Sequence, residues 1–186
     1  RVHLESFLAA VMRDAPRYQA QLESLRPGQA EARLVGGCLS MLAALDSWRR
    51  KAAKAVCDYS FHMAITSWGD DSADEMRAVV QEHGITSFKV FMAYKGAIMV
   101  DDAALYSVMR EAAKLGAVVT VHAENGDAVW HLQRELVARG CIGPEFHPVS
   151  RPGPVEGEAT ERALMMAGLH GAAAYIVHMT CKESVH

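Results

Sequence analysis

The chain has 186 residues, of which 51% are hydrophobic, and it carries a formal net charge of −3 at pH 7. This length is enough to bury one sizeable core and indicates one domain or part of a larger one. The small negative charge gives no support to a nucleic-acid or anionic-membrane partner, and no apolar run reaches the length that spans a bilayer. The four cysteines form no C-x-x-C pair and the first residues lack the layout of a signal peptide, so we expect a cytoplasmic protein with reduced thiols.

The first part of the chain gives few structural signals. Residues 6–13 are compatible with a helix, Arg33-Leu34-Val35 is the candidate strand before residue 40, and residues 40–53 form a clear helical pattern. From residue 55 onward, short apolar runs alternate with helical patterns. Strands are predicted at 55–63, 87–92, 117–122 and 174–179, and helices at 72–83, 101–115, 127–139 and 155–170.

The order of these elements predicts an α/β fold. Ser72, with Glu75 three residues later, is the predicted N-cap of its helix, and a Gly- and Pro-rich loop covers residues 141–154. Apolar strands separated by helices are typical of parallel β/α units with both faces of the sheet covered. A doubly wound sheet and a (β/α)₈ barrel both fit this pattern.

Two histidines and a lysine stand out as candidate functional residues. His122 and His178 end predicted strands, and Lys89 lies between aromatic residues inside another. The carboxyl ends of barrel strands meet at one mouth, where histidines from successive strands are well placed to share a metal. A structural role is the alternative for each histidine taken alone. His147, in the Gly- and Pro-rich loop, is a weaker candidate, and structural or surface roles are expected for the others: His62, His83, His131, His170 and His186.

Lys89 calls for a separate explanation because burying an ammonium group is costly unless it is paired or neutralised. One alternative is that its long side chain reaches the surface. The other is a depressed pKa, which makes the amine a nucleophile. A neutral amine can capture carbon dioxide as a carbamate, and such an anionic group can bridge two divalent metals.

Five segments of the chain together resemble one enzyme family. They are residues 58–63, residues 87–95, residues 121–127, the Ser150-Arg151-Pro152 passage with Glu156, Glu158 and Ala159, and residues 175–178 with Cys181 and Lys182. In order and spacing these segments resemble the dihydropyrimidinase and D-hydantoinase family of the amidohydrolase superfamily. The resemblance covers residues 39–186 and leaves 1–38 as a divergent or unmatched N-terminal segment.

The resemblance implies that residues 39–186 form central β/α units of a (β/α)₈ TIM-like barrel of the metal-dependent amidohydrolase type. It implies two divalent metal ions, with Zn²⁺ expected, bridged by a carboxylated Lys89. His122 and His178 would bind one of them, and the Tyr94 hydroxyl would donate to the developing oxyanion. The reaction would open dihydropyrimidines or hydantoins to N-carbamoyl amino acids. The expected partners are a small cyclic ureide or amide and further copies of the chain, as a homotetramer or homodimer.

The sequence departs from the family pattern at both ends. Family members carry a His-x-His metal-binding pair, for which His3 is the candidate second histidine, but Arg1 stands in place of the first. Arginine is not a plausible zinc ligand. The family's late aspartate would fall beyond His186. We therefore expect the 186 residues alone not to be a competent catalyst.

Two alternatives remain at this point. A non-catalytic relative, similar to the collapsin response mediator proteins, would share the fold and act by binding and assembly. Such relatives typically lose the lysine and histidine ligands, so the presence of Lys89, His122 and His178 favours an enzyme. An allantoinase or dihydroorotase would use a similar mechanism, but the Phe-Met-Ala-Tyr run and the Ser-Arg-Pro passage look more like hydantoinase.

Overall fold

The structure is a computed structural model that describes residues 40–185. The helix expected at 6–13, the strand expected at 33–35 and the candidate ligand His3 lie outside the described residues. No described helix combines the length and the apolar character that crossing a lipid bilayer requires.

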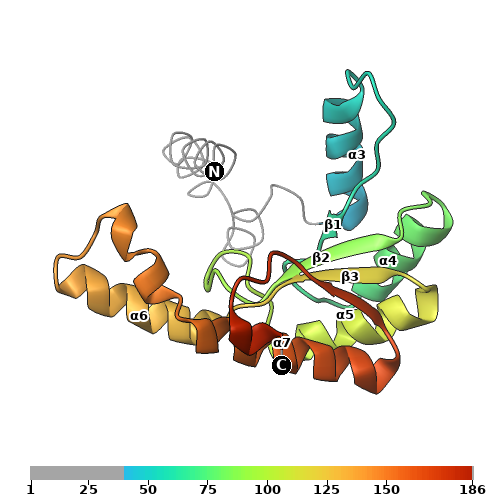
Figure 1. Ribbon diagram of the computed structural model, residues 1–186. Helices are drawn as coiled ribbons and strands as arrows, with labels where there is room; N and C mark the ends of the chain where they lie inside the picture. Colours follow the sequence, from blue (N-terminus) through green and yellow to red (C-terminus); the bar gives the residue numbers. More distant parts are fainter. Residues whose placement is uncertain (1–39, 186) are drawn as a thin grey trace. The chain divides into compact units, whose positions relative to one another are not determined.

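A sheet of four parallel strands is the centre of the described region (Figure 1). The strands are β1 (Met63–Ala64), β2 (Ser87–Phe91), β3 (Val118–His122) and β4 (Ala173–Ile176), and each pairs with the next in chain order. A doubly wound sheet reverses its strand order at a switch point. Over residues 40–185 the order does not reverse, which is the arrangement of a barrel.

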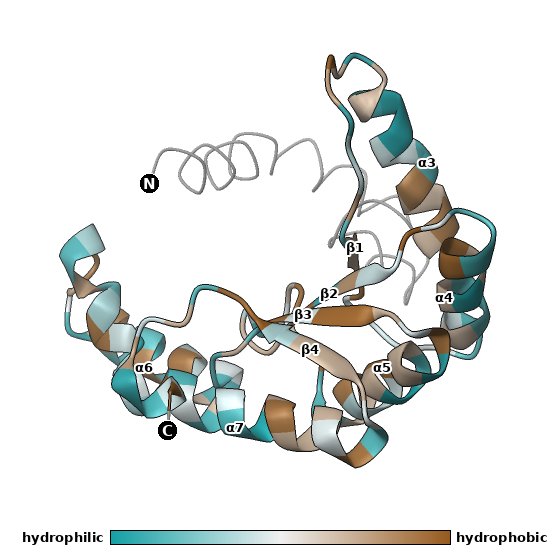
Figure 2. Cartoon of the chain, turned by 45° about the vertical axis from the view of Figure 1, so that its right-hand side comes forward, coloured by the Kyte–Doolittle hydropathy of each residue, from teal (hydrophilic) through white to brown (hydrophobic). Residues whose placement is uncertain are grey.

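Helices follow the strands in the order expected for β/α units. They are α3 (Met41–Ala52), α4 (Ser72–Gln81), α5 (Asp102–Leu115), α6 (Gly126–Ala138) and α7 (Gly153–His170). Short 3₁₀ turns lie at η1 (Pro144–Phe146), η2 (Pro148–Ser150) and η3 (Lys182–Ser184). Figures 1 and 2 show α4, α5 and α7 along the same face of the sheet. These three helices are placed as in a barrel, where the other face of the sheet lines the interior. Of the two folds that fit the sequence pattern, they match the barrel.

The hydrophobic core lies between the sheet and these helices. Alternate residues of β2, Phe88 and Val90, are fully buried, whereas Ser87, Lys89 and Phe91 on its other face are only partly buried. Figure 2 shows β3 as hydrophobic over much of its length. The other fully buried side chains of the core include Leu105, Val108 and Met109 of α5 and Val119 and Val121 of β3. The alternation along β2 places Lys89 on the face opposite to this core.

Polar caps fix the helix starts. The Asp101 side chain accepts a hydrogen bond of 2.8 Å from the Ala104 N–H at the start of α5. The Asn125 side chain accepts one of 3.0 Å from the Ala128 N–H at the start of α6. Caps of this kind satisfy backbone donors that have no partner within the helix. The second cap also fixes the chain three residues after His122.

Several predicted boundaries need correction. The strand expected at 55–63 is confined to Met63–Ala64, because residues 55–60 are exposed and only Met63 and Ala64 pair with β2. The predicted N-cap Ser72 is the first helical residue and Asp71 is the cap, while the Glu75 carboxylate accepts from the Met41 N–H at 2.9 Å and so connects α4 to α3. The strand predicted to end at Met179 ends at Ile176, so His178 lies two residues past β4.

Candidate functional site

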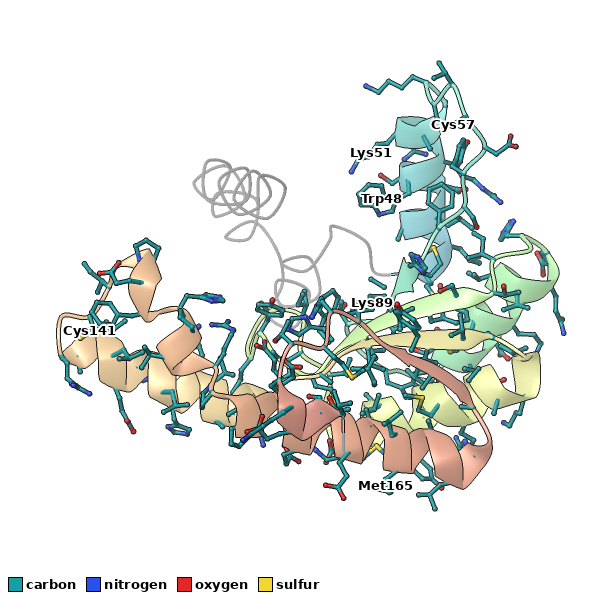
Figure 3. The ribbon with its side chains drawn as sticks, in the orientation of Figure 1. Trp48, Lys51, Cys57, Lys89, Cys141 and Met165 are labelled. Atoms are coloured by element: carbon teal, nitrogen blue, oxygen red, sulfur yellow. The ribbon has the colours of Figure 1, made fainter. Side chains whose placement is uncertain are left out.

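Lys89 extends from the middle of β2, on the face away from α5 and α7 (Figure 3). Its Nζ is buried without a hydrogen-bond partner among the residues that the structure describes, and it lies 4.7 Å from the centroid of the Phe91 ring. Burial lowers the pKa of this amine from 10.5 to about 8. A substantial neutral fraction is therefore present just above neutral pH, and the neutral amine is the nucleophilic form.

His122 and His178 converge from two neighbouring strands. His122 is the last residue of β3 and is buried, and His178 follows β4 in a left-handed backbone conformation with φ of 43°. His122 Nδ1 lies 2.8 Å from His178 Nε2. Burial lowers the pKa of His178, and the nearby charges of His122 and Lys89 lower it further. Low pKa values favour the neutral imidazole, which is the metal-binding form.

Glu124 lies on the other side of the His122 ring. Its Oε2 is 2.7 Å from His122 Nε2, and its Oε1 is 3.3 Å from Nε of Arg151. Burial acts to raise the pKa of Glu124, but the hydrogen bond and charge of His122, together with Arg151, hold it below its ordinary value. The ionised carboxylate therefore accepts a hydrogen bond from the Nε2–H group of His122. This contact leaves Nδ1, the nitrogen that faces His178, free to act as a ligand.

Tyr94 completes the cluster beside His122. It follows β2, its backbone φ is 70°, and its ring centroid lies 5.1 Å from that of His122. Burial raises the pKa of Tyr94, and the charge of Glu124 raises it further while Arg151 opposes them. The phenol consequently keeps its proton at neutral pH and can donate a hydrogen bond.

Phe91 connects Lys89 to the histidines. Its ring lies under the Lys89 amine and its centroid is 5.9 Å from that of His122. The structure therefore brings Lys89, Tyr94, His122 and His178 to one region, with Lys89 in β2 and the other three at or just past the ends of β2, β3 and β4. His3, the remaining residue expected in the site, lies outside the described residues.

The side chains of this cluster include few ordinary metal ligands. Within residues 40–185, no three or more His, Cys, Asp and Glu side chains gather in an arrangement that could hold an ion. Two converging imidazoles and a buried amine without a partner are present instead. A carbamate on Lys89 would add anionic oxygen ligands to the two nitrogen ligands, and this combination suits zinc and similar divalent ions. With a carbamate on Lys89, these residues fit a divalent metal ion.

Glu124 and Arg151 were not predicted as site residues. The signal for Glu124 was its place two residues after a strand-end histidine, in His-Ala-Glu-Asn. Arg151 comes from the loop before α7, and its contact with Glu124 spans 27 positions of sequence, which no local pattern reveals. His147 is exposed, but burial and the charge of Arg151 lower its pKa, so it lies near this pair.

Three other histidines contact residues outside the cluster, and their expected structural or surface roles stay predictions. His62 Nδ1 lies 2.6 Å from the Ser87 hydroxyl, His83 Nδ1 lies 3.2 Å from Nη1 of Arg49, and the ring centroids of His170 and Tyr106 are 4.4 Å apart. These contacts lie apart from the cluster around His122.

No family model matches the chain. Among curated proteins, it is 46% identical over 143 residues to a D-hydantoinase of Geobacillus stearothermophilus, a match that covers 76% of this chain and 30% of that protein. It is 45% identical over 141 residues to a dihydropyrimidinase of Dictyostelium discoideum, covering 75% of this chain and 28% of the relative. The crystal structure of dihydropyrimidinase from Brevibacillus agri superposes with a TM-score of 0.77 at 40% identity, over 83% of this chain and 36% of that one.

The chain spans about a third of the length of the relatives that it matches. Its parallel sheet without reversal and its helices on one face correspond to consecutive β/α units of these enzymes. Over the matched region the chain belongs to the D-hydantoinase and dihydropyrimidinase family, and its fold is part of that family's (β/α)₈ barrel.

Proposed function

We propose that this sequence supplies the lysine and histidine side of the active site of a metal-dependent cyclic-amide hydrolase. The observation that carries the proposal is the buried Lys89 amine, which has no partner among the described residues and a pKa of about 8, beside the converging rings of His122 and His178. Burying a lysine without a counter-charge is unfavourable in a purely structural site. Conversion of this lysine to a carbamate explains the arrangement.

In this proposal a carbamate on Lys89 would hold two divalent ions, with Zn²⁺ as the expected metal. Nδ1 of His122 and Nε2 of His178 would bind one of these ions. When bound, the metals supply a hydroxide nucleophile at neutral pH and polarise the substrate carbonyl. Glu124 holds the His122 ring through Nε2, and Arg151 keeps Glu124 ionised beside the site.

The Tyr94 hydroxyl acts on the substrate in this scheme. Because its raised pKa keeps the proton on the phenol, it donates a hydrogen bond to the carbonyl oxygen as negative charge develops there. The amide C–N bond of the ring then breaks. The hydroxyl group stays on the acyl carbon, and a proton goes to the departing ring nitrogen, so the product is an N-carbamoyl amino acid.

The substrate class is a small cyclic ureide, either a dihydropyrimidine or a hydantoin. The names of the relatives support this class over the substrates of allantoinase or dihydroorotase. A homotetramer or homodimer and a cytoplasmic location stay predictions, the first to be tested by light scattering of the purified protein. The assignment of 1–38 as an unmatched segment also stays a prediction.

The test uses the full-length product of the gene that carries this sequence, purified and supplied with Zn²⁺ and bicarbonate. We expect ring opening of dihydrouracil or hydantoin, and we expect Lys89→Ala to abolish both activity and metal loading. Lys95→Ala is the matched control, because Lys95 is exposed and pairs with Asp127 outside the cluster. Unchanged zinc content in folded Lys89→Ala would contradict the bridging role.

A further inference from the structure

Glu156, in the first turn of α7, accepts hydrogen bonds from three residues of the segment that follows His178. Its Oε1 accepts from the backbone N–H groups of Thr180 at 2.7 Å and Cys181 at 3.3 Å, and from the Ser184 hydroxyl at 3.1 Å. Its Oε2 accepts from the Thr180 hydroxyl at 2.7 Å. One side chain thus holds both the loop and the start of η3.

His178 lies between two anchor points. On its N-terminal side, the Val177 N–H donates to the Val121 carbonyl at 3.1 Å, which ends the pairing of β4 with β3. On its C-terminal side, the first anchored residue is Thr180, held by Glu156. His178 itself is exposed and has a positive φ of 43°, which is unfavourable for a residue other than glycine. Such a conformation persists where its surroundings enforce it.

The packing of α7 against η3 is a second, independent sign of the same docking. A Cβ atom at Gly157 would lie 2.6 Å from the Glu183 Cβ and 2.9 Å from the Glu183 carbonyl oxygen. The helix backbone therefore approaches η3 directly at the residue after Glu156. This close approach places the Glu156 carboxylate within reach of two backbone N–H groups of the loop.

We propose that Glu156 is a positioning residue that holds the His178 loop so that Nε2 of His178 points at Nδ1 of His122. The inference rests on the proposed function, in which His178 is a metal ligand. Glu156 touches neither substrate nor metal in this scheme, and it acts through Thr180 and Cys181. What it supplies is a correctly placed set of acceptor oxygens, and its negative charge is not required.

This distinction makes the glutamine variant informative. In Glu156→Gln the amide oxygen can take the three bonds now made to Oε1, and the NH₂ group can donate to the Thr180 hydroxyl, which can act as an acceptor. Glu156→Ala removes all of these contacts. Thr180→Val removes only the hydroxyl contact and is the milder variant if Glu156→Ala does not fold. Glu161→Ala is the surface control, because Glu161 is an exposed residue of the same helix.

The experiment measures zinc affinity by chelator competition, together with kcat, KM and Tm, in the full-length protein. We expect Glu156→Ala to weaken zinc binding about 10- to 100-fold, the usual effect of losing a group that orients a metal ligand. Thr180→Val should fall between Glu156→Ala and the wild type, and Glu156→Gln and Glu161→Ala should resemble the wild type. Val108→Ala, a core change in α5, controls for stability alone, and it should lower Tm without changing zinc affinity.

Two outcomes would overturn the positioning role. Wild-type zinc affinity in folded Glu156→Ala would show that the loop does not need this clamp, and a loss in Glu156→Gln equal to that in Glu156→Ala would show that charge matters. His178→Ala separates this inference from the proposed function. If His178→Ala loses zinc while Glu156→Ala keeps it, only the positioning role fails. If His178→Ala keeps zinc, the assignment of the ligand fails.

Discussion

Nδ1 of His122 lies 2.8 Å from Nε2 of His178, although the two residues are 56 positions apart in the sequence. The contact arises because β3 and β4 are parallel neighbours whose carboxyl ends meet at one edge of the sheet. Two imidazole nitrogens that converge in this way are a donor pair of the kind that binds a divalent metal. Three further predictions concern this cluster, and a fourth concerns α7.

Glu124→Ala should weaken zinc binding in the full-length protein. The carboxylate accepts from Nε2 of His122 and so fixes both the orientation and the tautomer of the ring. We expect a loss of about 10- to 100-fold in zinc affinity, as for other groups that orient metal ligands. Chelator competition measures it, with exposed Glu135→Ala on α6 as control. Equal affinities in the two variants would show that His122 needs no orienting partner.

Tyr94→Phe should lower kcat and leave zinc content unchanged. The phenyl ring keeps the packing against His122 and Phe91, and only the hydroxyl is lost. Removal of one donor to an oxyanion costs about 10²- to 10³-fold in kcat. Steady-state kinetics with dihydrouracil or hydantoin measure the effect, and exposed Tyr106→Phe on α5 is the matched control. A variant with wild-type kcat would exclude the donor role.

The stability of the metal-free protein should rise between pH 8 and pH 10.5. The folded pKa of Lys89 is about 8 and its ordinary value is 10.5. In that window the unfolded chain binds more protons at this residue than the folded chain, so deprotonation favours folding. Lys89→Met should flatten the rise in the free energy of unfolding, measured by urea denaturation at several pH values. The same slope in the variant and the wild type would contradict an unpaired, buried amine.

Two glycines of α7 should respond to alanine in opposite ways. The new methyl group in Gly157→Ala would collide with Glu183, and overpacking of this kind costs about 1–3 kcal/mol. Gly168 has nothing within 4 Å of the position of a Cβ, so Gly168→Ala should stabilise the helix by about 0.5–1 kcal/mol. Urea denaturation of both variants measures the difference. Destabilisation by both changes to the same degree would refute the close approach of α7 to η3.

The strands that carry the site were predictable where their sequence is unambiguous. Val118 to His122 is a β-branched run that fits a buried strand, and β2 alternates buried and partly buried residues. The stretch 55–63 misled because its aromatic and β-branched residues suit a strand, yet Asp58, Ser60 and His62 leave most of it exposed. Whether such a stretch forms a strand depends on its burial against a neighbouring strand, and that strand lies far away in the sequence.

The candidate site was predictable only in part, for a similar reason. Lys89 and His122 could be identified because a buried cation and a strand-end histidine are local anomalies in an apolar pattern. Arg151 contacts Glu124 across 27 positions, and Thr180 contacts Glu156 across 24. Both Arg151 and Thr180 belong to loops with no periodicity. Their roles depend on how the loops before and after α7 fold. The ligand roles of Lys89, His122 and His178 stay predictions until metal is measured.

The sequential strand order of the sheet also bears on how such a site can change over evolutionary time. Lys89, His122 and His178 each come from a different β/α unit, and within the described sheet each unit pairs with the units next to it in the sequence. Recombination at the boundary between units would exchange one of these groups and leave the backbone ladder on either side intact. The residues at this edge of the sheet can therefore change one unit at a time, while the pairing of the remaining strands is kept.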